Sequence, residues 1–373
     1  MSPKRLWTVC AFLLLLAPRY WAQQKPERPY WFALEQGKLA FRSGAYGEAL
    51  LAFEDARAQR RSTYTRMEED LVALLSISEV RRLGDNLELI ETYIAGKNYV
   101  NAGRALEEIY YRIPKTNLEN SAQKALAELG RLKDYPEAEY WIGETYRAEG
   151  ELSIAIRQYQ KAYEQRGLLE NPAFAPELLY KMAEAHRLRQ EYTEMERRLV
   201  EILAGDSLWS EDTDSFVRNA MTRTLETGGI NQFMTLYRYN NAGVLRAHTL
   251  LGFYYYATGR HSRAAEHLIF AFLIQNTILI EELNRIQYDY SFTTINELID
   301  TVVRMSSLSA YIEEIEYFKT AYYLGTAFFG IGKTKAAQEF WDYLSRNVRA
   351  GEWRGRAVAQ LMSPYVEKAL EMP

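Results

Sequence analysis

Apolar residues recur along this chain at intervals of three and four positions, which is the period of one face of an α-helix. Strand-like alternation of apolar and polar positions is scarce. Gly or Asn recurs where the helical patterns stop, as is typical of helix C-termini. The sequence therefore predicts an all-α fold. At 373 residues the chain is longer than a typical domain with a single compact core. Repeat proteins can be this long because they add repeats along one axis.

One segment gives the clearest repeating unit, a predicted helix pair that begins at Tyr140. Its marked positions are Gly143, Tyr146, Gly150, Ala155, Tyr159 and Ala162. Two antiparallel helices cross closely only where small residues such as Gly143 and Ala155 meet, and the Tyr side chains fill the remaining space. Gly150 is the expected turn between the two helices.

The same spacing recurs four more times with substitutions. The copies are Gly37, Ala40, Gly44, Tyr46, Ala49, Phe53 and Ala56; Met182, Ala183, His186, Gln190, Tyr192, Met195, Leu199 and Ile202; Leu251, Gly252, Tyr255, Gly259, Ala264, Leu268 and Ala271; and Leu324, Gly325, Phe328, Gly332, Ala337, Trp341 and Leu344. Two degenerate copies surround Gly96 and Gly228. Five matches to one loose pattern favour a repeat architecture.

This spacing resembles the tetratricopeptide repeat family, and an exported bacterial-type member fits best. The resemblance touches most of residues 28–347 and implies a right-handed superhelical solenoid of antiparallel helix pairs. Longer steps between copies than the family's usual repeat predict inserted helices at Thr63–Arg82 and Asn117–Leu132. A further degenerate pair is expected around Ile286–Ser309, and a capping helix over Trp353–Leu370.

The first 22 residues have the pattern of a secretory signal peptide. Lys4 and Arg5 precede an uncharged, Leu-rich stretch that is short for a bilayer span, and Ala22 offers a small residue for cleavage. We therefore expect a periplasmic or secreted protein with no integral membrane span in the mature chain. Because Tyr20 is bulky near the cleavage position, an uncleaved N-terminal anchor stays open.

A polar, acidic stretch from Gly205 to Asp214 suggests a division of the helical chain. The predicted organisation is residues 1–22 as signal peptide, residues 23–205 as an N-terminal helical block, and residues 206–373 as a C-terminal block with a capping helix. An ordinary loop between repeats is the simpler interpretation of the stretch, and the two blocks are then one continuous solenoid.

Charge and cysteine content narrow the classes of partner. Loss of the signal's three basic residues changes the formal net charge from −4 to −7, and no basic block remains, which argues against nucleic acid. It also removes Cys10, the single cysteine, so neither a disulfide nor a thiolate metal site is expected. The four histidines lack a metal-ligand spacing, and we expect no metal or other cofactor.

Catalytic motifs are weak. The run Phe329–Thr334 resembles a phosphate-binding loop, but Ala327 stands where that motif needs Gly, and a helix is expected before it. No serine elbow or Cys–His arrangement is present, and adjacent Glu pairs point about 100° apart on a helix. We therefore expect a protein that is not an enzyme.

The resemblance also implies which residues face a partner, because first helices of tetratricopeptide pairs line the concave surface. The candidates are Tyr140, Glu144, Arg147, Tyr180, Glu184, Arg187, Arg246, Phe253, Tyr256, Lys319, Tyr322 and Phe329. Tyr is well suited to interfaces, because it combines apolar area with a hydrogen-bonding tip. The competing interpretation is equally strong: Glu144–Arg147 and Glu184–Arg187 are ordinary surface pairs, and the Tyr side chains pack between repeats.

The expected function is an extracytoplasmic scaffold that binds a partner protein or peptide along this concave groove. A different class stays open, a binding accessory for small or hydrophobic ligands in a transport system, because the helices between Tyr239 and Phe329 are apolar and rich in aromatics. An enzyme with an unrecognised site is a third alternative that nothing in the sequence favours. Self-association also stays open, since Phe270–Ile280 is strongly apolar.

Overall fold

The computed structural model describes residues 29–75, 85–110, 117–206, 208–209 and 215–368, and this part of the chain is helical with no strand. The all-α prediction is confirmed. The predicted signal peptide, residues 1–22, lies outside the described residues. Contacts divide the chain into two compact units, one ending at Leu178 and one beginning at Leu179, inside a single helix. The expected boundary at residues 205/206 stays a prediction.

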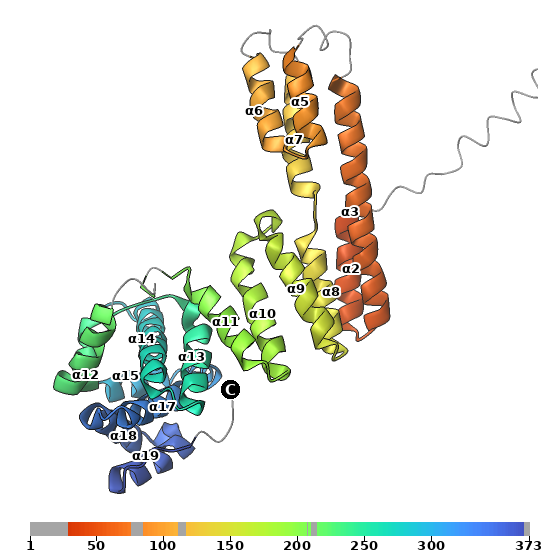
Figure 1. Ribbon diagram of the computed structural model, residues 1–373. Helices are drawn as coiled ribbons and strands as arrows, with labels where there is room; N and C mark the ends of the chain where they lie inside the picture. The colour runs from red at the N-terminus through yellow and green to blue at the C-terminus, as the bar shows by residue number, and fades with distance from the viewer. Residues whose placement is uncertain (1–28, 76–84, 111–116, 207, 210–214, 369–373) are drawn as a thin grey trace, which may run out of the picture. The chain divides into compact units, whose positions relative to one another are not determined.

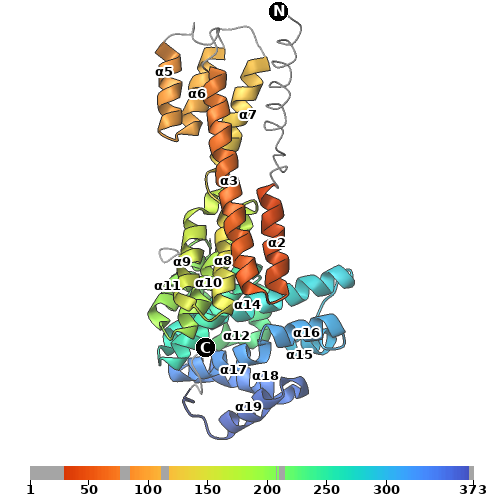
Figure 2. The same cartoon turned by 90° about the vertical axis from the view of Figure 1, so that its right-hand side faces the viewer.

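Unit 1 is organised around one long helix. Its α-helices are α2 (Tyr30–Arg42), α3 (Tyr46–Leu75), α5 (Asp85–Ala95), α6 (Tyr99–Tyr110), α7 (Asn117–Leu132), α8 (Pro136–Ala148) and α9 (Leu152–Glu164), followed by the 3-10 turns η2 (Arg166–Leu168) and η3 (Pro172–Phe174). Figures 1 and 2 show α2 and α8 beside the first half of α3, and α5, α6 and α7 beside its second half.

Each half of α3 contributes to a separate apolar core. Ala49, Phe53 and Ala56 of the first half pack with α2 and α8. Leu71 of the second half packs with α5, α6 and α7. The predicted α7 is confirmed with the bounds Asn117–Leu132. The separate helix predicted at Thr63–Arg82 is wrong in its start, because no Gly or Pro interrupts the chain after Gly47 and α3 continues through Thr63 to Leu75.

Unit 2 begins within α10 (Ala175–Leu188) and holds the remaining helices. They are α11 (Tyr192–Leu203), α12 (Ser215–Leu236), α13 (Ala242–Ala257), α14 (His261–Ile286), α15 (Ile295–Val302), α16 (Ser306–Glu314), α17 (Tyr317–Gly330), α18 (Thr334–Arg346), the 3-10 turn η4 (Val348–Ala350) and α19 (Glu352–Met362). The short helices α15 and α16 occupy the region where a degenerate pair was expected.

The final helix is shorter than the sequence pattern predicts. The expected helix over Trp353–Leu370 ends at Met362, and residues 363–368 follow it without helical structure. Pro364 explains the end, because its ring disfavours the helical conformation of the residue before it and it lacks an N–H donor. Ser363 accordingly has φ −150° and ψ 88°.

The helix pairs share one turn geometry. In each turn a residue with positive φ stands two positions before the second helix, and these residues are Gly44, Lys97, Gly150, Gln190, Gly259 and Gly332. The N–H groups of this left-handed residue and of the residue after it donate to carbonyls at the end of the first helix. In the α10–α11 turn, for example, Gln190 N donates to Arg187 O at 2.8 Å and Glu191 N donates to His186 O at 2.9 Å. In the degenerate copy around Gly96, the left-handed residue is Lys97 rather than the glycine.

Glycine also permits the closest contact inside four of these pairs. A Cβ at Gly143 would lie 2.6 Å from Cε1 of Tyr159, and one at Gly37 would lie 2.3 Å from Cε1 of Phe53. Gly252 meets Leu268 in the same way, and Gly325 meets Phe340 and Trp341. Each glycine of the first helix therefore accepts a large side chain of the second.

The longest helix of unit 2 is a core helix. Among the described residues, α14 alone is long and apolar enough to cross a bilayer by length and composition, and 83% of its apolar window is buried. Its side chains Phe270, Phe272 and Ile274 are fully buried. Packing within unit 2 accounts for its composition.

We predict that Gly143→Ala destabilises unit 1 by ~1–3 kcal/mol, because the added methyl group overlaps the Tyr159 ring. Gly103→Ala is the matched control: it lies inside α6 with nothing within 4 Å of the added atom, so it should stabilise by up to ~1 kcal/mol. Urea unfolding measures both free energies. Equal effects of the two substitutions would contradict the close-contact argument.

Two histidines are buried against each other in unit 2. His248 Nδ1 lies 3.1 Å from His267 Nδ1, and the Trp209 ring contacts both imidazoles. Burial lowers the pKa of His248 to about 3. Burial also lowers the pKa of His267, with smaller contributions from His248, Arg263 and Arg218. Both imidazoles are therefore neutral near pH 7.

We predict that unit 2 loses stability as the pH falls from 6.5 toward 3. The unfolded chain binds protons at these histidines near pH 6.5 and the folded chain does not, so each contributes full stability above pH 6.5 and ~1.4 kcal/mol less at pH 5.5. Urea unfolding at several pH values measures this slope. The variant His248→Leu/His267→Leu should have a shallower slope, and an unchanged slope would contradict the assignment.

Candidate binding cavity

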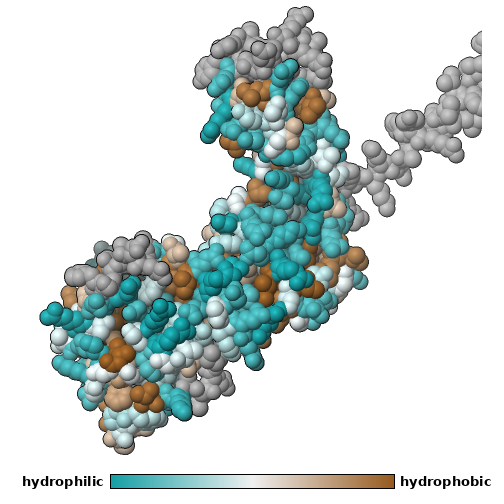
Figure 3. All heavy atoms as spheres, in the orientation of Figure 1, coloured by the Kyte–Doolittle hydropathy of each residue, from teal (hydrophilic) through white to brown (hydrophobic). Residues whose placement is uncertain are grey.

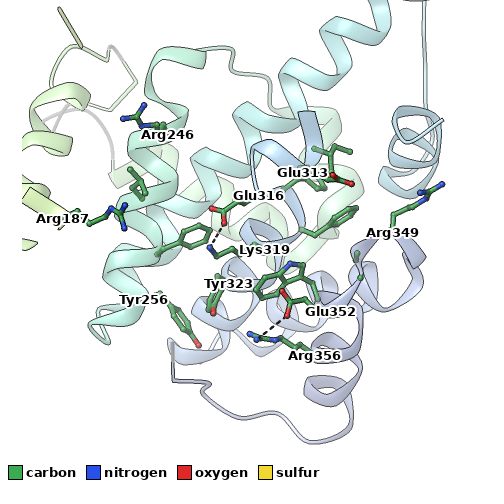
Figure 4. A pocket seen from close by; sticks show the side chains of 18 of the residues that line it. Arg187, Arg246, Tyr256, Glu313, Glu316, Lys319, Tyr323, Arg349, Glu352 and Arg356 are labelled. Atoms are coloured by element: carbon green, nitrogen blue, oxygen red, sulfur yellow. Dashed lines mark hydrogen bonds and ion pairs between the residues drawn. The ribbon is translucent and has the colours of Figure 1, made fainter. Parts of the chain in front are cut away.

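Unit 2 contains a cavity of about 990 Å³, walled by residues of α10, α11, α13, α16, α17, η4 and α19. Seven of the sequence-predicted partner-facing residues line it. They are Tyr180, Glu184, Arg187, Arg246, Phe253, Tyr256 and Lys319. Figure 4 shows Arg187 and Arg246 on one side of the cavity, and the Glu316–Lys319 and Glu352–Arg356 pairs on the other.

The α10 side of the cavity is fixed by one tyrosine. Tyr180 donates from its hydroxyl to the carbonyl of Gly243 at 2.8 Å and accepts from the N–H of Ala247 at 3.1 Å. The guanidinium of Arg246 lies 4.1 Å from the centre of the Tyr180 ring. The N-terminal part of α13 is thus held to α10 by groups that also line the cavity.

An aromatic cluster forms another wall. The Tyr323 ring centre lies 5.5 Å from that of Phe253, 4.9 Å from that of Tyr256 and 5.8 Å from that of Trp353. Lys319 Nζ lies 4.6 Å from the centre of the Phe253 ring. Burial raises the pKa of Tyr256 to about 12, so its hydroxyl stays protonated at neutral pH and can donate a hydrogen bond.

Charged side chains of both signs line the cavity, and only some of them are paired. Lys319 Nζ lies 2.7 Å from Glu316 Oε1, and Arg356 lies 3.8 Å from Glu352 Oε2. Within the described part of the chain, by contrast, no salt bridge or side-chain hydrogen bond engages Arg187 or Glu184. These two charges lie one helical turn apart on α10 and are available to a ligand.

Two predicted residues of unit 2 lie elsewhere. Tyr322 is fully buried, and its hydroxyl donates to a carboxylate oxygen of Glu367. Phe329 packs with its ring centre 5.6 Å from that of Trp341. Neither residue lines the cavity, because α17 is buried on most of its circumference and these positions face other helices.

The three predicted residues of unit 1 are committed to packing and internal bonds. Tyr140 contacts the ring of Phe174 at 4.9 Å between centres. Glu144 is buried, accepts a 2.5 Å hydrogen bond from the Tyr159 hydroxyl, and forms an ion pair with Arg147 at 3.1 Å. The Glu144–Arg147 pair therefore belongs to a partly buried network with Tyr159, and the placement of these residues on a partner-facing groove stays a prediction.

One substitution explains why the two similar trios differ. Residues Tyr140, Glu144 and Arg147 recur 40 positions later as Tyr180, Glu184 and Arg187, but Tyr159 recurs as Leu199. A leucine has no hydroxyl to donate to Glu184. Glu184 lines the cavity, whereas the carboxylate of Glu144 is buried and bonded to Tyr159.

Most lining residues contributed by the C-terminal elements were not predicted from the sequence. These are Ile312, Glu313, Glu316, Tyr317, Phe318, Tyr323, Arg349, Ala350, Gly351, Glu352, Trp353 and Arg356. They lie outside the first-helix positions that the repeat pattern marks, and only packing of α17, α18 and α19 brings them to α13. The sequence feature that could have indicated these residues is the aromatic and basic content of Trp353–Arg356.

The described residues hold no group of three or more His, Cys, Asp or Glu side chains arranged to bind a metal ion. The cavity instead combines aromatic faces, hydroxyl groups and unpaired charges. Such a lining can stack on apolar groups, bond to peptide groups and pair with charged side chains.

Comparison with known proteins gives relatives without an assigned role. A Treponema pallidum (strain Nichols) protein is 24% identical over 333 residues, which is 89% of either chain. A Borreliella burgdorferi (strain ATCC 35210 / DSM 4680 / CIP 102532 / B31) protein is 20% identical over 232 residues, covering 57% of this chain and 72% of its own. Both are described as uncharacterized proteins. No protein-family model matches the sequence.

We predict that Tyr159→Phe destabilises unit 1 by ~1–3 kcal/mol, because it leaves the buried Glu144 carboxylate without its hydroxyl donor. Tyr146→Phe is the control, since no hydrogen bond of the Tyr146 hydroxyl is present in the described structure and its change should be small. Urea unfolding gives both values. A cost for Tyr159→Phe no larger than the control would contradict the assigned hydrogen bond.

Proposed function

We propose that this protein is a binding protein rather than an enzyme, and that the cavity of unit 2 receives a segment of a partner protein. The observation that carries the proposal is that seven residues selected from the sequence as partner-facing line one cavity, with Arg187 and Glu184 unpaired on its wall. Unpaired charges of opposite sign beside aromatic faces suit the alternating side chains and peptide groups of an extended chain.

The finer architecture is part of the same proposal. We propose a tetratricopeptide-like solenoid whose helix pairs stack in a right-handed superhelix with inserted helices. The shared left-handed turns and the contacts of Gly37, Gly143, Gly252 and Gly325 with large side chains support it, because they are the local features that the repeat pattern requires. Such a chain would present its binding residues on a rigid helical frame.

The proposed setting is extracytoplasmic, in the periplasm or as a secreted protein. The charged and then apolar pattern of residues 1–22 supports it. We propose a scaffold role there, with a protein or peptide as partner and with no nucleic acid or cofactor required. The acidic net charge supports the exclusion of nucleic acid.

A small ligand is the second candidate, in an accessory protein of a transport system. Its support is the cavity volume of about 990 Å³, which lies at the upper end of the range of small-molecule pockets. The charged lining favours an amphiphilic ligand over a purely apolar one, because buried charges without partners are costly beside hydrocarbon.

We predict that the full-length protein enriches a common sequence motif from a library of displayed random peptides. The double variant Glu184→Ala/Arg187→Ala should bind the enriched peptides at least tenfold more weakly, because it removes both unpaired charges of α10. Fluorescence anisotropy with synthetic copies of these peptides gives the affinities, and circular dichroism checks that the variant is folded.

Arg285→Ala is the matched control, since Arg285 is 77% exposed on α14 and does not line the cavity. It should leave peptide affinity unchanged. Enriched peptides that bind the α10 double variant as tightly as the wild type would place the partner elsewhere. Failure to enrich any motif, together with a thermal shift by amphiphilic small molecules, would favour the second candidate.

A further inference from the structure

The segment that follows α19 contacts the cavity's own lining. Residues 363–368, which we call the strap, leave the helix at Ser363 and carry no regular structure. The N–H of Tyr365 donates to Oε1 of the fully buried Gln360 at 3.0 Å, which turns the strap back along the protein. Glu367 is thereby brought against α13, α17 and α19.

One strap residue receives most of the polar contacts. The carbonyl of Glu367 accepts a hydrogen bond from the Tyr256 hydroxyl at 2.7 Å. Its carboxylate lies 3.2 Å from Nη1 of Arg356 and accepts a hydrogen bond from the Tyr322 hydroxyl. The Glu367 side chain is only 13% exposed. Two phenols and one guanidinium therefore bind a single acidic residue through its side chain and its backbone.

Two of these three groups belong to the cavity. Tyr256 and Arg356 line it, and Figure 4 shows both at the same end as Tyr323 and Glu352. Burial raises the pKa values of Tyr256 and Tyr322, so both phenols remain hydrogen-bond donors at neutral pH. This end of the cavity is thus equipped to bind a carboxylate next to an accepting carbonyl.

The rest of the strap contributes little packing. Tyr365 is 51% exposed and Val366 is 49% exposed, so the two large apolar side chains of the strap do not enter the core. Ordering such a segment costs conformational entropy that apolar burial does not offset here. The strap is consequently held mainly by the three polar contacts of Glu367 and by the Tyr365–Gln360 hydrogen bond, and a competing segment would replace the contacts of Glu367.

We infer that Arg356 and Tyr322 form a carboxylate subsite beside the cavity, and that Tyr256 binds the backbone carbonyl of the same acidic residue. The partner is an extended protein segment with an acidic side chain, and the strap occupies this subsite in competition with it. This inference rests on the proposed function of the cavity. The expected partner segment carries an Asp or Glu in an extended stretch of backbone. Apolar residues next to that Asp or Glu would pack against the aromatic wall of the cavity. The inference also accounts for the hydrogen bond of the Tyr322 hydroxyl to Glu367, although Tyr322 does not line the cavity.

The test uses the full-length chain with Glu367→Gln, which weakens the strap without shortening the protein. The probe is the capped, fluorescently labelled peptide Ser-Pro-Tyr-Val-Glu-Lys, the sequence of residues 363–368. We predict that it binds the Glu367→Gln protein at least tenfold more tightly than the wild type, because the neutral Gln side chain loses the ion pair with Arg356 and competes less well for the subsite. The peptide with Gln in place of Glu should bind at least tenfold more weakly.

Two further variants locate the bound peptide. Arg356→Ala combined with Glu367→Gln should lose the peptide, whereas Arg354→Ala in the same background should keep it, since Arg354 bonds to the carbonyl of Ser345 and does not line the cavity. Asp342→Asn in the wild-type chain is the control for loss of a carboxylate, because Asp342 pairs with Arg346 on α18, and it should not increase peptide binding.

The outcomes separate this inference from the proposed function. Equal binding of the labelled peptide to the wild-type and Glu367→Gln proteins, or equal binding of the Glu and Gln peptides, overturns the subsite. If displayed peptides depend on Glu184 and Arg187 but are indifferent to Glu367→Gln, the binding function stands and the competing strap is wrong. If circular dichroism shows that Glu367→Gln unfolds the protein, Arg356→Lys tests the subsite instead. It should reduce the hydrogen-exchange protection of the Tyr365 N–H, which bonds to Gln360 in the docked strap, and unchanged protection would overturn the subsite.

Discussion

The fold depends on close approach of two helices at a residue without a side chain. Gly143 accepts the ring of Tyr159, and Gly37 accepts that of Phe53 in the same way. In the four pairs that have such a glycine, these contacts bury large side chains that a wider spacing would leave partly in water. The left-handed residue of each turn then reverses the chain within three residues, so the second helix meets the first in register. Gln190 and Lys97 adopt this conformation without being glycine, which means that the surrounding hydrogen bonds, rather than the residue type, impose it.

The same scaffold carries different chemistry in its two units because of single substitutions within the pairs. Tyr159 supplies the hydroxyl that binds Glu144, and this makes the Glu144–Arg147 pair part of the interior of unit 1. Leu199 supplies no such donor, and Glu184 and Arg187 line the cavity of unit 2. A hydrogen bond inside the helix pair thus separates the buried carboxylate of Glu144 from that of Glu184.

The face of the protein seen in Figure 3 is mostly hydrophilic. Figure 3 shows hydrophilic side chains over most of the face in view, with apolar residues in small separate patches. Isolated exposed apolar residues of this kind are normal for folded proteins. The concentrated combination of aromatic rings and charges is instead found in the cavity of unit 2, and Glu367 of the strap bonds to two of its lining residues, Tyr256 and Arg356. Recognition in this protein is therefore proposed to be local and to depend on a few named side chains.

The helical period and the turn signals determined by themselves that the described part of the chain is all-α, that Gly44, Gly150, Gly259 and Gly332 lie in turns between helices, and that α7 spans Asn117–Leu132. They did so because helix formation depends on residues three and four positions apart. The sequence pattern also selected seven cavity residues, since first-helix positions share a face. Only tertiary structure decided that α3 runs through Thr63, that Tyr322 meets Glu367, and that Arg356 and Trp353 join α13 at one cavity. Those outcomes depend on packing between segments distant in the chain, which no local periodicity encodes.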